Sequence, residues 1–269
     1  MSEAGRSWRR RGIVLFSLAI IAWSLLVPPR SLLGKCDLVG YALCHRIPSH
    51  SFHLAGRQLP LCARCTGIYL GTLWVILFIS MTHRRGSRFP PTPILALLMV
   101  FFLFQAVDGL NSYLALLFHL YEPRNLLRFI AGVLNGLTIG ALVVPLFNAA
   151  LWRSPASEPS IQEWWEVEVL LIGTGGLTAL ISADIPLLLY PLAVCSALSA
   201  VLVLTLVNTT IVIMAAGREG MAVGWTQAWL PLLVGLDLSL LEMGALILMR
   251  GLATYWLGFP LSSALASQL

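Results

Sequence analysis

The chain has 269 residues, of which 58% are apolar and only 11% charged, with a formal net charge of +5 and a mean hydropathy of +0.85. Because soluble domains carry about 25% charged residues, this composition excludes an ordinary soluble protein and indicates an integral membrane protein. Nearly all the basic residues are arginines between apolar runs, a pattern typical of loops that face phospholipid headgroups. Nucleic-acid binding would require a basic stripe on a soluble module. We therefore expect the lipid bilayer, and no nucleic acid, as a partner.

The first predicted membrane helix spans residues 12–27. Arginines precede it as in a secretory signal, but no small-residue cleavage site follows it. We therefore expect a retained helix, anchored at the membrane surface by Trp23 and the flanking arginines. A polar loop is expected over residues 28–65, and a second apolar helix over residues 66–81.

Five further helices are predicted from apolar runs of membrane-spanning length. The third covers residues 94–120, with a polar centre, and the fourth covers residues 126–147. Residues 167–215 are long enough for two helices, with the turn expected at residues 182–186 and Tyr190-Pro191 as a competing position. The seventh covers residues 225–249. The predicted fold is therefore all-α: a polytopic integral membrane protein with about seven transmembrane helices.

Glycines recur at helical spacing in the second and fourth predicted helices. They are Gly67, Gly71, Gly132, Gly136 and Gly140. Glycines four residues apart share one helix face and let another backbone approach closely in lipid. We expect the second and fourth helices to pack together or against the third, and a homo-oligomer through the same ridges is a further hypothesis.

The distribution of arginines suggests an orientation in the membrane. Four arginines precede the first helix, and Arg84, Arg85 and Arg88 follow the second, so both groups fall on one side. The positive-inside rule then places the N-terminus in the cytoplasm of a prokaryote and the cysteine-bearing loop outside its cell membrane. Five basic residues within that loop oppose this assignment.

Reactive side chains concentrate in residues 44–71, which hold three of the five cysteines and three of the five histidines. Cys62 and Cys65 form a C-x-x-C motif, whose spacing suits a tetrahedral metal. Together with Cys44 and His45 they make a set of ligands that zinc or iron accepts. Adjacent residues in an extended chain point in opposite directions, so His50 is an alternative fourth ligand.

Two other hypotheses for these cysteines stay open. A helix N-terminus and Arg64 would stabilise a thiolate, so Cys62 and Cys65 also suit a membrane thiol–disulfide oxidoreductase. Cys36 and Cys44 would then form a second pair, which resembles the arrangement of membrane thiol oxidases that pass electrons to quinone. The third hypothesis is a structural disulfide in a non-enzymatic scaffold or transport subunit. Whether the protein is an enzyme, and on which substrate, is therefore left open.

The motif region resembles a known family. Its Cys-His-Arg-x-Pro motif at 44–48 and its Cys-Ala-Arg-Cys-Thr-Gly-Ile-Tyr-x-Gly motif at 62–71 are similar to the signature of predicted membrane proteins called domain of unknown function 2085. The resemblance covers about residues 36–148 and implies a small polytopic membrane domain with no established activity. Matching positions are Cys44, His45, Cys62, Arg64 and Cys65. His50 stands where a basic residue is expected, and Cys36 and His53 lie outside the signature.

The resemblance divides the chain into three predicted parts. Residues 1–35 form a basic segment with the first membrane helix, residues 36–148 form the family-like membrane domain with its Cys/His loop, and residues 149–269 form an extension of about three transmembrane helices.

Ionisable residues within membrane helices are costly and mark candidate functional positions. Asp108 is the strongest candidate, as a proton relay or substrate contact beneath the cysteines, with a helix-packing hydrogen bond to Gln105 or Asn111 as the alternative. Asp237 and Glu242 lie about 140° apart around a helix and do not form one carboxylate pair. The candidates for a catalytic role are Asp108, His45 and Arg64, since the sequence lacks P-loop, serine-hydrolase and zinc-protease motifs.

Overall fold

The computed structural model describes residues 3–82, 85–114 and 120–257. Its helices are α1 Glu3–Leu26, α2 Leu32–Leu43, α3 Ala63–Thr82, α4 Thr92–Leu114, α5 Asn125–Leu151, α6 Trp164–Ser182, α7 Leu189–Ala215 and α8 Trp225–Leu257. Two 3-10 turns cover Pro48–His50 and Pro186–Leu188. The strands are β1 His53–Leu54, β2 Arg57–Gln58, β3 Gly86–Arg88 and β4 Ala156–Pro159. The first two strands pair antiparallel and the last two pair parallel.

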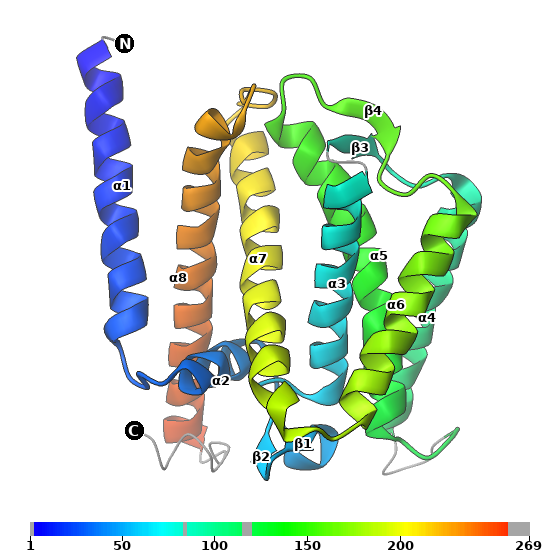
Figure 1. Ribbon diagram of the computed structural model, residues 1–269. Helices are drawn as coiled ribbons and strands as arrows, with labels where there is room; N and C mark the ends of the chain where they lie inside the picture. Colours follow the sequence, from blue (N-terminus) through cyan, green and yellow to red (C-terminus); the bar gives the residue numbers. More distant parts are fainter. Residues whose placement is uncertain (1–2, 83–84, 115–119, 258–269) are drawn as a thin grey trace.

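The predicted class is confirmed. Within the described residues, six helices, α3 to α8, are long and apolar enough to cross a membrane, and α1 stands beside α8 as a further long helix (Figure 1). About seven helices were expected. The turn expected at 182–186 is also confirmed, because α6 ends at Ser182 and the next turn begins at Pro186.

Several boundaries differ from the prediction. The loop expected over residues 28–65 contains α2, which lies across the end of the bundle (Figure 1) and contacts α7 and α8. A hydropathy search misses α2 because the helix has only 12 residues and includes Lys35 and Asp37. It is therefore too short and too polar to be recognised as a membrane span. The second membrane helix begins at Ala63, before the predicted residue 66, which places Cys65 in its first turn. The third predicted helix is α4, which is described over Thr92–Leu114; its predicted end near 120 lies beyond residues 115–119, which are outside the described residues.

The most extensive helix–helix contact within the described residues is between α3 and α5, as the glycine spacing predicted. A Cβ added at Gly67 or Gly71 would collide with the backbone of α5, and one added at Gly132 or Gly136 would collide with the backbone of α3. The Thr72 hydroxyl donates a hydrogen bond across this contact to the carbonyl of Gly136, at 3.1 Å. Since contacting residue numbers rise together along both helices, α3 and α5 run parallel, and their N-termini lie at the same end.

The two acidic residues of α8 face different helices. The Ser17 hydroxyl of α1 lies 2.5 Å from a carboxyl oxygen of Asp237, whereas the Asn208 side chain of α7 donates to Glu242 at 2.9 Å. The expectation that they do not form one pair is therefore confirmed, and both carboxyl groups take part in helix–helix hydrogen bonds.

Substituting Gly136 by alanine tests the α3–α5 contact. The added Cβ would meet the carbonyl oxygen of Ile68 and the amide nitrogen of Thr72, and backbone atoms cannot rotate away. We expect Gly136→Ala to lower the free energy of unfolding in detergent by about 2 kcal/mol. Gly176→Ala on α6 is the control, because a Cβ there meets nothing within 4 Å. Equal stability of the two variants would contradict this account of the contact.

Candidate functional site

Three cysteine sulfurs converge at the end of the bundle that carries α2. Cys44 directly follows α2, Cys62 directly precedes α3, and Cys65 lies in the first turn of α3. Their Sγ atoms all lie within 4.8 Å of one another. The backbone amide of Cys62 donates a hydrogen bond to the Cys44 sulfur at 3.3 Å. We call these three residues the sulfur cluster.

The end of α2 brings Cys44 to the other two cysteines. A Cβ added at Gly40 would collide with the carbonyl of Pro60, so α2 touches the chain that leads into Cys62. Arg250 of α8 donates hydrogen bonds to the carbonyls of Tyr41 and Cys44, which caps the end of α2. The position of Cys44 is therefore fixed both by a close backbone approach and by a side chain from a distant helix.

An ion-pair network holds the loop between Cys44 and Cys62. Asp37 of α2 accepts one hydrogen bond each from Arg46 and Arg57, both at 2.6 Å. Gln58 donates to the carbonyl of Arg46 at 3.0 Å. Arg46 itself has a positive φ of 52°, which turns the chain immediately after the Cys44–His45 pair. The buried carboxylate thus ties the β1–β2 hairpin to α2.

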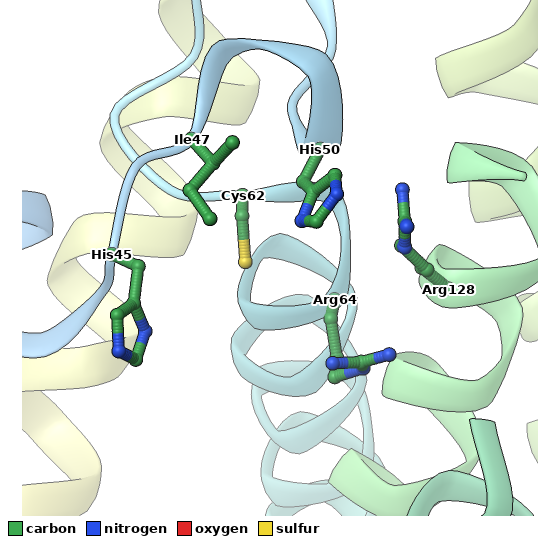
Figure 2. Close-up of a pocket in the computed structure, with 6 residues that line it drawn as sticks. All are labelled: His45, Ile47, His50, Cys62, Arg64 and Arg128. Atoms are coloured by element: carbon green, nitrogen blue, oxygen red, sulfur yellow. The ribbon is translucent and has the colours of Figure 1, made fainter. Parts of the chain in front are cut away.

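A small pocket of about 90 Å³ lies beside the sulfur cluster. Figure 2 shows the side chains that line it, which are His45, Ile47, His50, Cys62, Arg64 and Arg128. Cys62 is the member of the cluster that contributes to this lining. His45 and His50 lie on the pocket walls and are not in the group of three converging ligand atoms. Burial, assisted by the charges of Arg128 and Arg64, lowers the pKa of His50, so its imidazole is neutral at neutral pH.

Arg64 connects the cluster to the membrane interior. It lies between the two cysteines of the C-x-x-C motif, and its guanidinium pairs with the fully buried carboxylate of Asp108 on α4. The same nitrogen lies 3.2 Å from the hydroxyl of Ser112. The Tyr121 hydroxyl donates to the other oxygen of Asp108 at 3.0 Å. Both carboxylate oxygens therefore have partners.

The partner expected for Asp108 was wrong. Neither Gln105 nor Asn111 bonds to this carboxylate; Asn111 instead accepts a hydrogen bond from the Leu120 amide and donates one to the Tyr121 carbonyl. An ion pair with Arg64 outweighs a neutral amide contact because the buried carboxylate needs a compensating charge. The expectation that Asp108 lies close beneath the cysteines is consistent with this pairing.

Three further residues of the site were not identified as such from the sequence. Arg128 lines the pocket. The one feature of the sequence that could have pointed to it is the presence of an arginine inside the apolar fourth predicted helix. Tyr121 and Arg250 reach the site from a loop and from the last helix. No motif links them to the cysteines.

Comparison with known proteins places this region in context. A family model described as "Predicted membrane protein (DUF2085)" matches residues 44–142. An uncharacterised protein of Methanocaldococcus jannaschii is 32% identical over 156 residues, which cover 52% of this chain and 94% of the relative. An uncharacterised protein of Methanothermobacter thermautotrophicus is 35% identical over 109 residues, covering 40% of this chain and 91% of the relative. No solved structure matches. The matched residues include the whole sulfur cluster together with Asp108 and Arg128.

The Arg64–Asp108 pair predicts a large loss of stability when its carboxylate alone is neutralised. Asp108→Asn leaves the guanidinium without a compensating charge, so we expect the free energy of unfolding to fall by about 3 kcal/mol. Adding Arg64→Gln should recover part of that loss, since the double variant buries no unpaired charge. Chemical denaturation in detergent measures the free energy of unfolding of the single and the double variant.

Tyr121→Phe is the control for this comparison of single and double variants, because it removes a hydrogen bond to Asp108 but no charge. Its expected cost is about 1 kcal/mol. Strictly additive effects of the Arg64 and Asp108 substitutions would show that the two side chains are not energetically coupled.

Proposed function

The chain belongs to the DUF2085 family of predicted membrane proteins, and we propose that it binds one zinc or iron ion through Cys44, Cys62 and Cys65. The observation that carries this proposal is the convergence of three sulfurs from two segments 18 residues apart. A tetrahedron with metal–sulfur bonds of about 2.3 Å places its sulfurs about 3.8 Å apart. The sulfur cluster, with separations within 4.8 Å, is compatible with that geometry.

The electrostatics of Cys44 support metal binding. Hydrogen bonds from the Cys62 and Cys65 thiols lower the pKa of Cys44. A backbone amide also points at its sulfur. The cluster therefore stabilises a thiolate, which is the form of cysteine that ligates zinc or iron.

The fourth coordination position would face the pocket. Cys62 belongs both to the cluster and to the pocket lining, and His45 and His50 lie on the same lining. We propose one of these imidazoles, or a water molecule, as the fourth ligand. Three protein ligands and water are typical of a catalytic zinc site, where the metal acts as a Lewis acid or activates the water. His45, Arg64 and Asp108 are the candidates for positioning or proton transfer beside it.

A thiol–disulfide oxidoreductase is the second candidate. It is favoured by one observation, that Cys62 and Cys65 are free and partly exposed at the start of α3. The pair that such an enzyme would form between Cys36 and Cys44 has less support. Burial, with the neighbouring Asp37 carboxylate, raises the pKa of Cys36 to about 11, so this thiol stays protonated and unreactive.

We further propose the orientation in the membrane. The start of α1 lies at the same end of the bundle as β3 and β4, and α2 with the β1–β2 hairpin lies at the opposite end (Figure 1). Arginines at the first end support a cytoplasmic N-terminus and an extracytoplasmic sulfur cluster. The archaeal origin of both relatives supports the cell membrane of a prokaryote.

The remaining organisation is also a proposal. We propose that residues 36–148 form the family-like membrane domain, and residues 149–269 an extension that packs on it through α7. The glycine ridge of α5 is covered by α3 within the chain. A homo-oligomer would therefore use another surface.

Metal analysis of purified protein tests the proposed function. We expect about one equivalent of zinc or iron per chain, and a loss of most of it in Cys44→Ser, Cys62→Ser and Cys65→Ser. Cys36→Ser is the matched control, since Cys36 is also a buried cysteine of this region and lies outside the cluster. It should keep the metal of the wild type.

Counting free thiols on the same samples separates the alternatives. Metal-free protein with a Cys62–Cys65 disulfide that cycles at a measurable potential would favour the oxidoreductase. A disulfide that never cycles, and whose loss only impairs folding, would favour a structural role in a scaffold or transport subunit.

A further inference from the structure

The pocket is a space beside the sulfur cluster rather than the site of the metal itself. Of the three sulfur-bearing residues, only Cys62 contributes to its lining. Its volume of about 90 Å³ is several times the roughly 10–15 Å³ that one water molecule needs in a cavity. A ligand group of a few heavy atoms would therefore fit next to the proposed metal.

The pocket is rich in hydrogen-bond donors. Arg128 is 95% buried, since its exposed fraction is 5%. Its Nε and Nη1 atoms lie within hydrogen-bond distance of Ser112 and Asn125, whereas its Nη2 has no partner among the described residues. Arg64 also lines the pocket, and its hydrogen bonds within the described residues all come from Nη2, to Asp108 and Ser112. Two guanidinium groups thus bring unused N–H donors to one small space.

The pocket lining contains no carboxylate. Asp108 is not part of the lining, and its two oxygens are occupied by Arg64 and Tyr121. Among the described residues, Arg46, Arg57 and Arg64 each form an ion pair, and Arg128 forms none. A buried guanidinium without a paired anion is costly, so this position favours a ligand that supplies the negative charge.

The proposed metal centre would not use these donors. Three thiolates around a divalent ion carry one net negative charge, which offsets part of the positive charge of the arginines. Each metal-bound thiolate keeps lone pairs that can accept a hydrogen bond, as the Cys44 sulfur does from the Cys62 amide, but sulfur is a weak hydrogen-bond acceptor. Oxygen acceptors therefore suit the unused N–H groups of Arg64 and Arg128 better than the metal-bound sulfurs do.

We propose that the pocket binds an oxyanionic group, a carboxylate or phosphate, through Arg128 and Arg64. The planar guanidinium matches two oxygens of such a group at once. In placing that group beside the metal, the inference rests on the metal site proposed above. The arginines would hold the anionic end of a substrate while Cys62 and the two histidines surround its other side.

Binding of inorganic phosphate and of acetate to the full chain in detergent tests the proposal, at constant ionic strength set with chloride. Equilibrium dialysis with radiolabelled anions should show saturable binding of at least one of them to the wild type. Arg128→Gln should weaken that binding by about tenfold or more, because a charge-assisted bidentate contact is lost. Arg128→Lys keeps the positive charge but loses the planar guanidinium that can bind two oxygens at once. Its affinity for the anion should therefore lie between those of the wild type and Arg128→Gln.

Arg124→Gln is the matched control. Arg124 lies one turn before Arg128, at the exposed start of α5, and is outside the pocket lining. Its substitution should leave anion binding unchanged. If the Arg128 variants fail to fold, the measurement on the wild type still tests the proposal. A wild type that shows saturable binding of neither phosphate nor acetate overturns it. Equal weakening in the Arg124 and Arg128 variants would overturn it as well.

Metal content measured on the same samples separates this inference from the metal site. Metal-loaded protein that binds neither anion contradicts the anion pocket alone, whereas metal-free protein that binds phosphate contradicts the metal site alone. Reconstitution into phosphatidylcholine nanodiscs, with or without phosphatidylglycerol, identifies the source of the oxyanion. Free-phosphate binding that is lost only with the anionic lipid would assign the pocket to a lipid headgroup, and binding retained in both would assign it to a soluble ligand.

Discussion

The close parallel packing of α3 against α5 is the contact on which the rest of the structure depends. It exists because glycines at four-residue spacing remove the side chains that would hold two helix backbones apart. Two parallel helices that touch along their length also bring their N-termini together. One of those N-termini carries Cys62, Arg64 and Cys65, and the other carries Arg128. The approach of Arg128 to Arg64 and Cys62 in the pocket is therefore a consequence of this backbone contact, whereas α2 brings Cys44 to the sulfur cluster.

The polar groups of the site form two layers around that contact. In the outer layer, Asp37 binds Arg46 and Arg57 and holds the loop that carries Cys44. In the inner layer, Asp108 binds Arg64 and Tyr121 at the membrane-facing side of the cluster. Buried ion pairs contribute little net stability but are expensive to break. Their arrangement thus favours one geometry of the cysteines, which a metal site requires because its ligands must be held in place before the ion arrives.

Much of the fold could be predicted from the sequence because lipid imposes a strong rule: a span needs about 20 apolar residues. The α6–α7 turn and the α3–α5 contact follow from proline, aspartate and glycine positions. The short interfacial α2 could not be predicted in this way, since its burial depends on α7 and α8 rather than on its own hydropathy. The convergence of Cys44 with Cys62 and Cys65 was predicted from the motif. The Arg64–Asp108 pair was not predicted, because its two residues lie 44 positions apart in the sequence. The role of Arg128 was not predicted either, because it depends on where α5 begins relative to α3.

X-ray absorption spectroscopy at the zinc or iron edge tests the central claim most directly, because it reports which atoms surround the metal. On metal-loaded full-length protein, the account predicts three sulfur neighbours at about 2.3 Å and one nitrogen or oxygen neighbour near 2.0 Å for zinc. A first shell made only of nitrogen and oxygen, or one with a single sulfur, would contradict a metal site built from Cys44, Cys62 and Cys65.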